Sequence, residues 1–477
     1  MHVHLIGVCG TGMGAFAGLL KAAGHRVTGS DSSFAPPMGP ALQRYGVETM
    51  EGPNPDNLSP APDLVVVGNV CRSTNVEARA AIDGGLEYRS FPALMEELFL
   101  KNRRSFVMAG THGKTTTTSL MAFLLREVGQ DPGLLVGGLP LDFAESFRLG
   151  SETSPFVIEG DEYDCAFFEK SPKFWRYNPH AVLLTSAEHD HIDIYPDGES
   201  YEAAFHGLID RIPEDGLLVA YAGDEAVRRI AARAKCRVSF YALDGDDCGD
   251  VSPIWMGALA PGGGGVTPID LYGGGSMMGR IHFPMSGHHN ARNLVGVLAL
   301  AAEGAGADLA SLMKASARFS GVRRRQDLLA VAGGVHVYDD FAHHPTAVFE
   351  TLRGIRSVHP KGRLLVAFEP RSATASRRLH QELYAEAFAP ADLSILAPVG
   401  RKEIAEAERL DTTQIALEIN EAGGQAVAPE SLEETLAAIT REAKAGDTVV
   451  LMSNGTFGGL YDEVIAALTP LRTKETK

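Results

Sequence analysis

The stretch A-G-T-H-G-K-T-T-T-T-S at residues 109–119 constrains the fold more than any other part of the chain. An apolar run at 105–109 predicts a short buried strand before it, and the apolar spacing of 120–128 predicts a helix after it. Glycines at 110 and 113 allow backbone N–H groups to turn toward an anion, and the helix N-terminus adds the positive end of its dipole. The strand, loop and helix together predict a phosphate-binding loop in an α/β domain.

A lysine and a threonine give this loop its expected chemistry. Lys114 can reach the β- and γ-phosphates of a nucleotide, and the hydroxyl of Thr115 is placed to bind Mg²⁺. The spacing is shorter than G-x-x-x-x-G-K-[ST], and the alternative is a glycine turn that merely opens a helix. That alternative leaves Lys114 and the threonine run unexplained. We therefore predict a nucleoside triphosphate site formed by Gly110, Thr111, Gly113, Lys114, Thr115 and Thr116.

The whole-chain numbers exclude several classes of protein. The 477 residues suggest about three domains, and 45% hydrophobic with 22% charged residues is typical of a globular enzyme. A net charge of −17 argues against binding to nucleic acid or to an anionic membrane. Five scattered cysteines, no signal peptide and no apolar run long enough for membrane insertion predict a cytoplasmic protein.

A second glycine-rich loop follows the strand predicted at residues 3–8. Gly10, Gly12 and Ala15 satisfy G-x-G-x-x-[GA], and Asp31 follows at the spacing where an acidic residue would meet a ribose. This pattern fits an NAD-dependent dehydrogenase. The glycine pattern fits binding of a nucleotide-sugar diphosphate equally well, because any anion bound at a helix N-terminus requires the same glycines.

Ser73, Thr74 and Asn75 follow another apolar strand, predicted at 63–68. They stand at the carboxyl end of that strand, where ligands of parallel sheets bind. The alternative is that they cap the helix that follows.

Carboxylates and histidines follow two strands of the central region. The strand predicted at 156–159 ends in E-G-D-E-Y-D, which predicts that Glu159 binds Mg²⁺ rather than lying in a solvated turn. The strand predicted at 181–186 is followed by E-H-D-H-I-D. A zinc site and a solvated loop are alternatives for that stretch. Its position indicates instead that one histidine serves a second Mg²⁺ or the phosphoryl site.

Residues 286–293, S-G-H-H-N-A-R-N, open a helix predicted at 294–302. Asn290 and Asn293 lie on one face of its first turn, where they can read a base edge or cap the helix, and His289 lies beside them. The glycine-rich stretches 261–265 and 273–275 predict hairpin turns to which we assign no chemistry.

Strand and helix patterns alternate from 322 to the end, including a strand predicted at 364–368 and a helix predicted at 373–389. Arg371 follows that strand, at the sheet edge where ligands bind, and it can grip a carboxylate bidentately or pair with Glu369. The chain thus divides into three predicted domains, 1–104, 105–321 and 322–477.

The separated motifs, in this order, resemble those of the Mur ligases, which build the peptide of bacterial peptidoglycan with ATP. The motifs that carry the resemblance are G-T-H-G-K-T-T at 110–116, E-x-D-E-x-D at 159–164, D-H-x-D at 190–193, H-N-x-x-N at 289–293, R-R at 324–325 and D-D-F-x-H-H-P at 339–345. The resemblance implies an α/β fold of three domains: a Rossmann-like N-terminal domain, a P-loop ATPase-like central domain and a Rossmann-like C-terminal domain.

The resemblance also implies roles for residues at matching positions. Lys114, Glu159 and His191 would be catalytic, with metal ligation by Thr115, Glu159 and His191. ATP would further contact His289, Asn290, Asn293, Arg325 and Asp340. UDP-N-acetylmuramate would bind at Gly10, Thr11, Gly12, Met13, Ser30, Asp31 and Ser73, and the incoming amine component at His343 and Arg371.

The chemistry that the resemblance implies is amide formation through an acyl phosphate, with ATP and Mg²⁺ as cofactors. One kind of family member adds L-alanine to UDP-N-acetylmuramate, and another adds the tripeptide L-alanyl-γ-D-glutamyl-meso-diaminopimelate. Stretches such as D-F-A at 340–342, E-P-R-S at 369–372 and M-S-N-G at 452–455 are similar to the tripeptide-adding kind. We therefore expect a tripeptide ligase, with the alanine ligase as the alternative.

The chain departs from the family pattern at two positions. Ser186 stands where asparagine is frequent, so no role is carried onto it. Several relatives hold a carbamylated lysine after the D-H histidine, but His206 stands there, and residues 195–216 contain no lysine. A carbamate bridge between two magnesium ions is therefore not expected.

Overall fold

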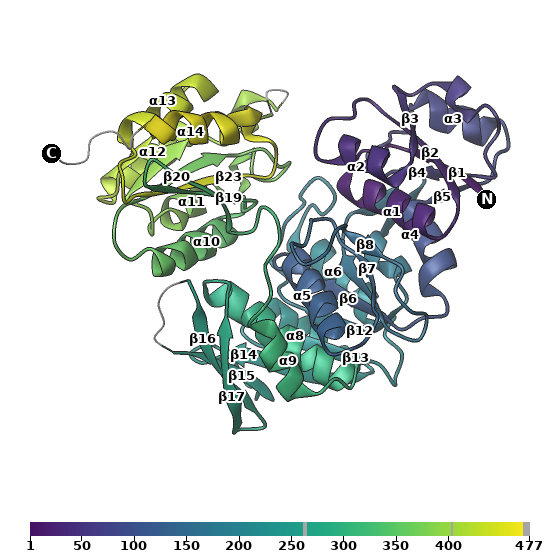
Figure 1. Ribbon diagram of the computed structural model, residues 1–477, viewed down its shortest axis with the longest axis horizontal. Helices are drawn as coiled ribbons and strands as arrows, with labels where there is room; N and C mark the ends of the chain where they lie inside the picture. The colour runs from purple at the N-terminus through teal and green to yellow at the C-terminus, as the bar shows by residue number, and fades with distance from the viewer. Residues whose placement is uncertain (261–264, 402–403, 471–477) are drawn as a thin grey trace.

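The computed structural model describes residues 1–260, 265–401 and 404–470. Its strands form three large sheets, each with helices packed on it, and one short ribbon of β10 (Asp164–Ala166) and β11 (Glu169–Pro172). We call the parts that carry these sheets the first, central and third units. The first and third units flank the central unit (Figure 1).

The first unit contains an all-parallel sheet of order β3-β2-β1-β4-β5. The direction of the strand order reverses at β1, so the loops after β1 and β4 face the crevice where such sheets bind ligands. Its strands are β1 (His2–Ile6), β2 (Arg26–Asp31), β3 (Glu48–Glu51), β4 (Leu64–Val67) and β5 (Tyr88–Ser90). Its helices are α1 (Thr11–Ala22), α2 (Met38–Tyr45), α3 (Val76–Asp83) and α4 (Phe91–Met95), with the short η1 (Pro55–Leu58) and η2 (Glu96–Leu100).

The central unit contains a ten-stranded sheet of order β17-β16-β15-β14-β13-β12-β6-β9-β7-β8. Strand β6 pairs in parallel with β9 on one side and β12 on the other, so the phosphate loop after β6 lies at the switch point of the sheet. The remaining bounds are β6 (Ser105–Ala109), β7 (Gly133–Leu135), β8 (Phe147–Arg148), β9 (Phe156–Gly160), β12 (Pro179–Leu184), β13 (Leu217–Tyr221), β14 (Arg237–Leu243), β15 (Trp255–Leu259), β16 (Thr267–Gly273) and β17 (Ser276–Phe283). The helices are α5 (Lys114–Glu127), η3 (Lys173–Arg176), α6 (Gly198–Ile209), α7 (Glu225–Ala231), α8 (His288–Gly304) and α9 (Leu309–Ser316).

The predicted glycine-rich turns have different outcomes. Residues 273–275 join β16 to β17 in an antiparallel hairpin, which confirms the prediction there. The other predicted turn, at 261–265, lies outside the described residues except for Gly265.

The third unit contains a sheet of order β18-β19-β23-β20-β21-β22 that is parallel except for the edge strand β18. Its strands are β18 (Asp327–Ala332), β19 (Val335–Asp340), β20 (Leu364–Glu369), β21 (Leu393–Leu396), β22 (Ala426–Val427) and β23 (Thr448–Ser453). Its helices are α10 (Pro345–Val358), η4 (Arg378–His380), α11 (Gln381–Ala387), η5 (Glu406–Glu408), α12 (Thr412–Glu421), α13 (Leu432–Glu442), η6 (Phe457–Gly459) and α14 (Leu460–Leu468).

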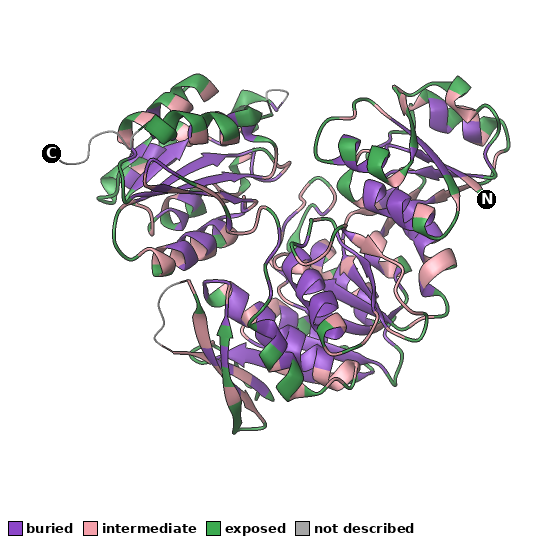
Figure 2. Ribbon diagram, in the orientation of Figure 1, coloured by how far each residue is buried: buried purple, intermediate pink, exposed green. Residues whose placement is uncertain are grey.

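The inner strands of each unit are buried, as the purple ribbons of Figure 2 show, whereas edge strands such as β3 and β17 are largely exposed. The apolar runs of β4, β6 and β20 are buried at every position, which is typical of parallel strands covered on both faces. The α/β fold class predicted from the sequence is confirmed. No helix of the described residues is both long and apolar enough to cross a membrane.

The helix predicted at 373–389 is wrong in its first half, because α11 begins only at Gln381. Serine side chains bond to nearby backbone in the segment before it. Ser372 Oγ accepts a hydrogen bond from the Ala375 amide at 2.9 Å, and Ser376 Oγ donates to the Pro370 carbonyl at 3.3 Å. These bonds close a single turn, and the chain then leaves helical geometry because Arg377 forms a β-bridge with Arg409 before α11 begins.

Candidate active site

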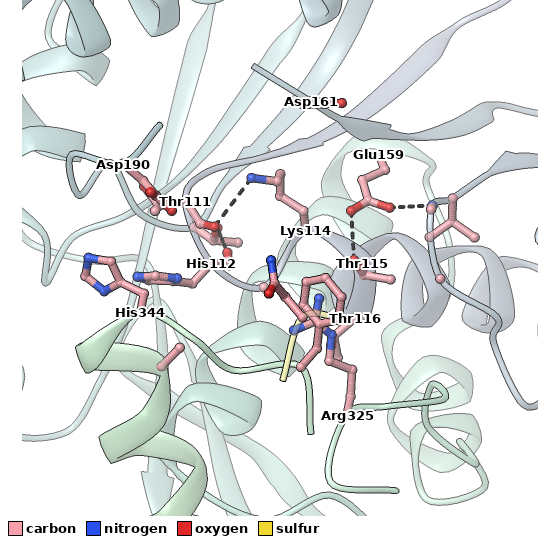
Figure 3. Close-up of a pocket in the computed structure, with 18 of the residues that line it drawn as sticks. Thr111, His112, Lys114, Thr115, Thr116, Glu159, Asp161, Asp190, Arg325 and His344 are labelled. Atoms are coloured by element: carbon pink, nitrogen blue, oxygen red, sulfur yellow. Dashed lines mark hydrogen bonds between the residues drawn. The ribbon is translucent and has the colours of Figure 1, made fainter. Parts of the chain in front are cut away.

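One cavity of about 1420 Å³ is lined by residues of all three units. The central unit contributes the phosphate loop, the first unit contributes Gly10 to Met13, and the third unit contributes Asp340 to His344. Figure 3 shows Thr115 of the phosphate loop beside Glu159, and His112 of the same loop beside His344. Because the cavity joins three segments that are far apart in sequence, it is the candidate active site.

The phosphate loop requires glycine at two positions. Gly110 and Gly113 have φ angles of +133° and +83°, in the region that side chains disfavour. A Cβ on Gly110 would lie 2.2 Å from Thr185 Oγ1, and one on Gly113 would lie 2.6 Å from Asn293 Oδ1. The two glycines therefore let the loop fold tightly under α8 and against the end of β12.

Lys114 is held by a buried carboxylate. Its Nζ donates to both carboxylate oxygens of Glu162 at 2.9 Å and to the Gly110 carbonyl at 2.7 Å. Burial opposes the charged form of Lys114, but the charge of Glu162 outweighs it and raises the lysine pKa. Lys114 is thus a fixed cation at the mouth of the loop, as phosphate binding requires.

Thr115 and Glu159 form the second pair of the loop. The hydroxyl of Thr115 donates to Glu159 Oε1 at 2.7 Å, while Glu159 Oε2 accepts from the Gly137 amide at 2.6 Å (Figure 3). A hydroxyl and a carboxylate are the oxygen ligands that Mg²⁺ prefers, so the residues present fit the predicted ion. The metal role of this pair stays a prediction.

His191 lies beside the same carboxylate as Lys114. Its Nε2 is 3.0 Å from Glu162 Oε1, and its backbone is strained, with φ at +57°. Burial lowers the pKa of His191, but the bond to Glu162 outweighs burial and raises it. Tyr201 adds a hydrogen bond to Glu162 Oε1 at 3.3 Å, and Tyr195 donates to the Glu162 carbonyl at 2.5 Å.

Glu162 is the functional residue that sequence reasoning missed. Its side chain is fully buried, and the Lys114 ammonium and the His191 ring converge on it. The available signal was its place in the run of acids after β9, but the sequence did not show which of those acids points inward. In the structure Asp161 pairs instead with Lys173 at 2.6 Å, and Asp164 pairs with Lys170 at 2.8 Å.

The predicted base-side residues lie along the cavity wall. Helix α8 begins at His288, earlier than predicted, and so carries His289, Asn290 and Asn293 in its first turns. Asn290 Nδ2 donates to the Ser286 carbonyl at 2.8 Å, but no side chain of the described residues caps the first turn of α8, so the capping alternative does not hold for this residue. Asn293 packs over the phosphate loop instead.

Arg325 and Asp340, also predicted to contact ATP, line the cavity from the third unit. The Arg325 guanidinium lies 4.8 Å from the centre of the Phe341 ring, and burial lowers its pKa. The carboxylate of Asp340 accepts hydrogen bonds from the Gln326 and Ala342 amides at 2.7 and 2.8 Å. Asp340 therefore shapes the two loops that bring Arg325 and Phe341 to the cavity.

The first-unit residues predicted to bind UDP-N-acetylmuramate lie partly on the cavity wall and partly away from it. Gly10, Thr11, Gly12 and Met13 line the cavity, whereas Ser30, Asp31 and Ser73 are absent from the lining among the described residues. Asp31 Oδ2 accepts from the Cys9 amide at 2.8 Å and so shapes the glycine loop from behind.

The other two polar residues of the first unit are also placed away from the cavity. Ser30 Oγ donates to Glu77 at 2.8 Å inside the unit, and Ser73 is exposed. Its neighbour Asn75 caps α3 through the Glu77 and Ala78 amides, so the capping alternative describes that stretch.

The two predicted peptide-side residues lie at different depths. His343 lines the cavity, and burial lowers its pKa, which keeps the ring neutral. Arg371 lies outside the lining, with its side chain 44% exposed and its Nη1 3.5 Å from Glu369 Oε1. It packs against Gly400 and Gly455 at the carboxyl edge of the third sheet. This geometry is compatible with either role considered for Arg371, binding of a substrate carboxylate or pairing with Glu369.

His206, at the position of the carbamylated lysine in some relatives, lies on α6 beside Arg233 and does not line the cavity. The buried carboxylate next to His191 is supplied by Glu162 instead.

Three family models match the chain in order: the Mur ligase family catalytic domain at residues 2–103, the Mur ligase middle domain at 108–301 and the Mur ligase glutamate ligase domain at 324–455. The chain therefore belongs to the Mur ligase family. It is an ATP-dependent ligase, and the dehydrogenase interpretation of the first glycine loop is wrong.

Individual relatives cover nearly the whole chain. The UDP-N-acetylmuramate–L-alanyl-γ-D-glutamyl-meso-2,6-diaminoheptandioate ligase of Escherichia coli K12 is 34% identical over 98% of both chains. A crystal structure of a murein peptide ligase from Psychrobacter arcticus 273-4 covers 100% of both chains, with 32% identity and a TM-score of 0.73. A UDP-N-acetylmuramate–L-alanine ligase of Roseiflexus sp. RS-1 is 33% identical over 82% of this chain and 84% of its own.

Proposed function

We propose that the protein joins UDP-N-acetylmuramate to the tripeptide L-alanyl-γ-D-glutamyl-meso-diaminopimelate by ATP-dependent amide formation. The observation that carries this proposal is the single cavity, which brings the phosphate loop, the first glycine loop and His343 together. The support for the acceptor is the similarity to tripeptide ligases over nearly the full chain. We also propose that it works in the cytoplasm, where ATP and UDP-sugars are available.

The chemical problem is that a carboxylate is a poor electrophile. Its oxygen would attack the γ-phosphorus of ATP, and ADP would leave with the electron pair of the broken P–O bond. The amine of the tripeptide would then attack the acyl carbon, and phosphate would leave with one former carboxylate oxygen. Water must be kept from the acyl phosphate between these steps, which favours a cavity closed by several units.

Lys114 is placed to neutralise charge on the transferring phosphoryl group, the main need of this reaction. To do so, Lys114 Nζ must give up its hydrogen bonds to the Glu162 carboxylate and donate to phosphate oxygens instead. Thr115 and Glu159 would hold one Mg²⁺, and His191 with the neighbouring Glu162 would hold a second. When bound, these ions supply charge neutralisation and orientation for the phosphoryl oxygens.

The remaining residues would bind and orient the substrates. Asn293 and Arg325 face the nucleotide side, and Gly10 to Met13 offer a helix N-terminus to the diphosphate of the UDP-sugar. His343 and, further out, Arg371 would contact the tripeptide.

The second candidate is an L-alanine ligase, favoured by the 33% identity to the enzyme of that name. One assay distinguishes the two candidate functions. Phosphate release is measured with UDP-N-acetylmuramate and ATP, with either the tripeptide or L-alanine as acceptor. We expect kcat/KM for the tripeptide to exceed that for L-alanine, and a preference for L-alanine would contradict the proposal.

A further inference from the structure

Two histidines and a glutamate from both sides of the cavity converge on one point. His112 belongs to the phosphate loop, Glu188 follows β12, and His344 caps α10 of the third unit. His112 Nε2 is 2.7 Å from Glu188 Oε2, and His344 Nδ1 is 3.8 Å from the same oxygen. One donor atom from each residue lies within 4.8 Å of the other two. We call these residues the His–Glu–His cluster; Figure 3 shows its two rings adjacent, with centroids 5.0 Å apart.

His344 is the unexplained member of this cluster. Its side chain is 5% exposed, yet neither ring nitrogen has a hydrogen-bond partner among the described residues. Buried polar groups almost always have hydrogen-bond partners, so a buried ring with two unbonded nitrogens indicates that a ligand binds there. Because neither ring nitrogen of His344 is hydrogen-bonded within the described part of the chain, the ring can offer a lone pair to a ligand, as a metal site needs.

Internal bonding accounts for the other two members but not for His344. Glu188 accepts from His112 and, through Oε1, from Thr346 at 2.6 Å. Both oxygens of Glu188 are therefore engaged, while the nearest approach of His344 is longer than a hydrogen bond.

We propose that the His–Glu–His cluster is a binding site for a divalent transition cation such as Zn²⁺. Two imidazoles and one carboxylate form a common donor set for zinc, whereas Mg²⁺ prefers oxygen ligands. Bond lengths of about 2.0–2.2 Å place neighbouring ligand atoms about 3.3 Å apart in a tetrahedron. The observed 2.7 and 3.8 Å separations bracket that value, so small ring rotations bring the donors to the cation.

The site has a structural consequence because its ligands come from two units. A cation bound there ties the phosphate loop and the segment after β12 to the start of α10. Because all three residues also line the cavity, water or a substrate group could reach a cation held by them.

The test uses the full chain and Co²⁺, which absorbs visible light strongly in tetrahedral sites and weakly in octahedral ones. We expect a tetrahedral spectrum that saturates at one equivalent and is displaced by Zn²⁺. His344→Ala, His112→Ala and Glu188→Gln should each weaken Co²⁺ binding at least about tenfold. The side chains of His112 and Glu188 are 27% and 42% exposed, so these two variants should fold even where His344→Ala does not.

Two further variants separate this site from others in the cavity. His289→Ala removes another cavity histidine and should leave the spectrum unchanged, as should Glu159→Ala, which removes the predicted magnesium ligand. Zn²⁺ should also raise the unfolding midpoint of the parent but not of Glu188→Gln. The proposal is overturned if Co²⁺ gives only octahedral spectra, or if Glu159→Ala rather than the cluster variants abolishes the signal.

Discussion

At the scale of single residues, side chains that bond to one another in the structure must change partners when substrate binds. Glu162 holds both Lys114 and His191 in the structure, and each of these must also serve the phosphoryl group in the proposed reaction. The buried carboxylate keeps Lys114 charged and holds the ring of His191 in place before substrate arrives. The same pairing makes Glu162 a positioning residue in this account.

Lys114→Ala should lower the rate of phosphate release at least about a hundredfold, the order seen when one preorganised donor is removed from an active site. Rates are compared with those of Lys170→Ala, which removes an exposed lysine paired with Asp164. The measurement is made below the unfolding midpoint of the variant, because Glu162 loses its strongest partner. Near-normal turnover would show that the loop does not bind the transferred phosphate.

Arg371→Lys should weaken use of the tripeptide while the KM for ATP stays near normal. A guanidinium can bind a carboxylate through two parallel hydrogen bonds, which an ammonium cannot reproduce. We expect a loss in kcat/KM worth about 1.5–3 kcal/mol. Arg378→Lys, at an exposed ion pair with Asp411 in the same unit, is the control. Equal losses for ATP and tripeptide would assign Arg371 a structural role with Glu369.

At the scale of helices and strands, α8 and α10 form the contact between the central and third units beside the cavity. Glu350 on α10 lies 3.1 Å from Arg292 on α8 and 2.8 Å from Arg353 on its own helix. Its carboxylate is 14% exposed, and His289 lies 3.6 Å away. Burial opposes ionisation, but His289 and the two guanidinium groups outweigh it and lower the pKa of Glu350 to about 2.

A lowered folded-state pKa means that Glu350 stabilises the fold above its unfolded pKa and loses that effect as the pH falls toward 2. Glu350→Gln should therefore reduce the free energy of unfolding at pH 7 by about 2–3 kcal/mol, and the deficit should shrink between about pH 4.5 and 2. Urea unfolding of both proteins at several pH values measures it. The exposed pair of Glu225 with Arg229 supplies Glu225→Gln as a control. A deficit that stays constant down to pH 3 would contradict this account.

Elements with strong apolar runs could be predicted from the sequence, and those shaped by contacts between distant residues could not. The strand predicted at 105–109 has the bounds of β6, and the strand predicted at 364–368 differs from β20 by one residue, because an apolar run alone specifies each of them. The helix predicted at 373–389 was wrong in its first half because Arg377 forms a β-bridge there with Arg409, which is distant in sequence. Asp31 fits a ribose-binding pattern by spacing, yet its carboxylate is used by the Cys9 amide, a contact that no spacing rule contains.

At the scale of the whole molecule, the cavity exists only because three units meet. The glycine loops could each be found in the sequence, because glycine, lysine and threonine at fixed spacing carry their own signal. The meeting of His112, Glu188 and His344 could not be found, because it depends on how the third unit docks on the central unit. The buried pairing of Glu162 with Lys114 and His191 likewise depends on the fold of two loops at once.

The central claim is that this cavity activates the carboxylate of UDP-N-acetylmuramate with ATP and passes it to the tripeptide. It is tested most directly by mass spectrometry of the products formed from substrate labelled with ¹⁸O in both carboxylate oxygens. The account predicts that one labelled oxygen appears in inorganic phosphate and that the other remains in the new amide of the nucleotide–tripeptide product. Unlabelled phosphate, or release of phosphate without that product, would contradict it.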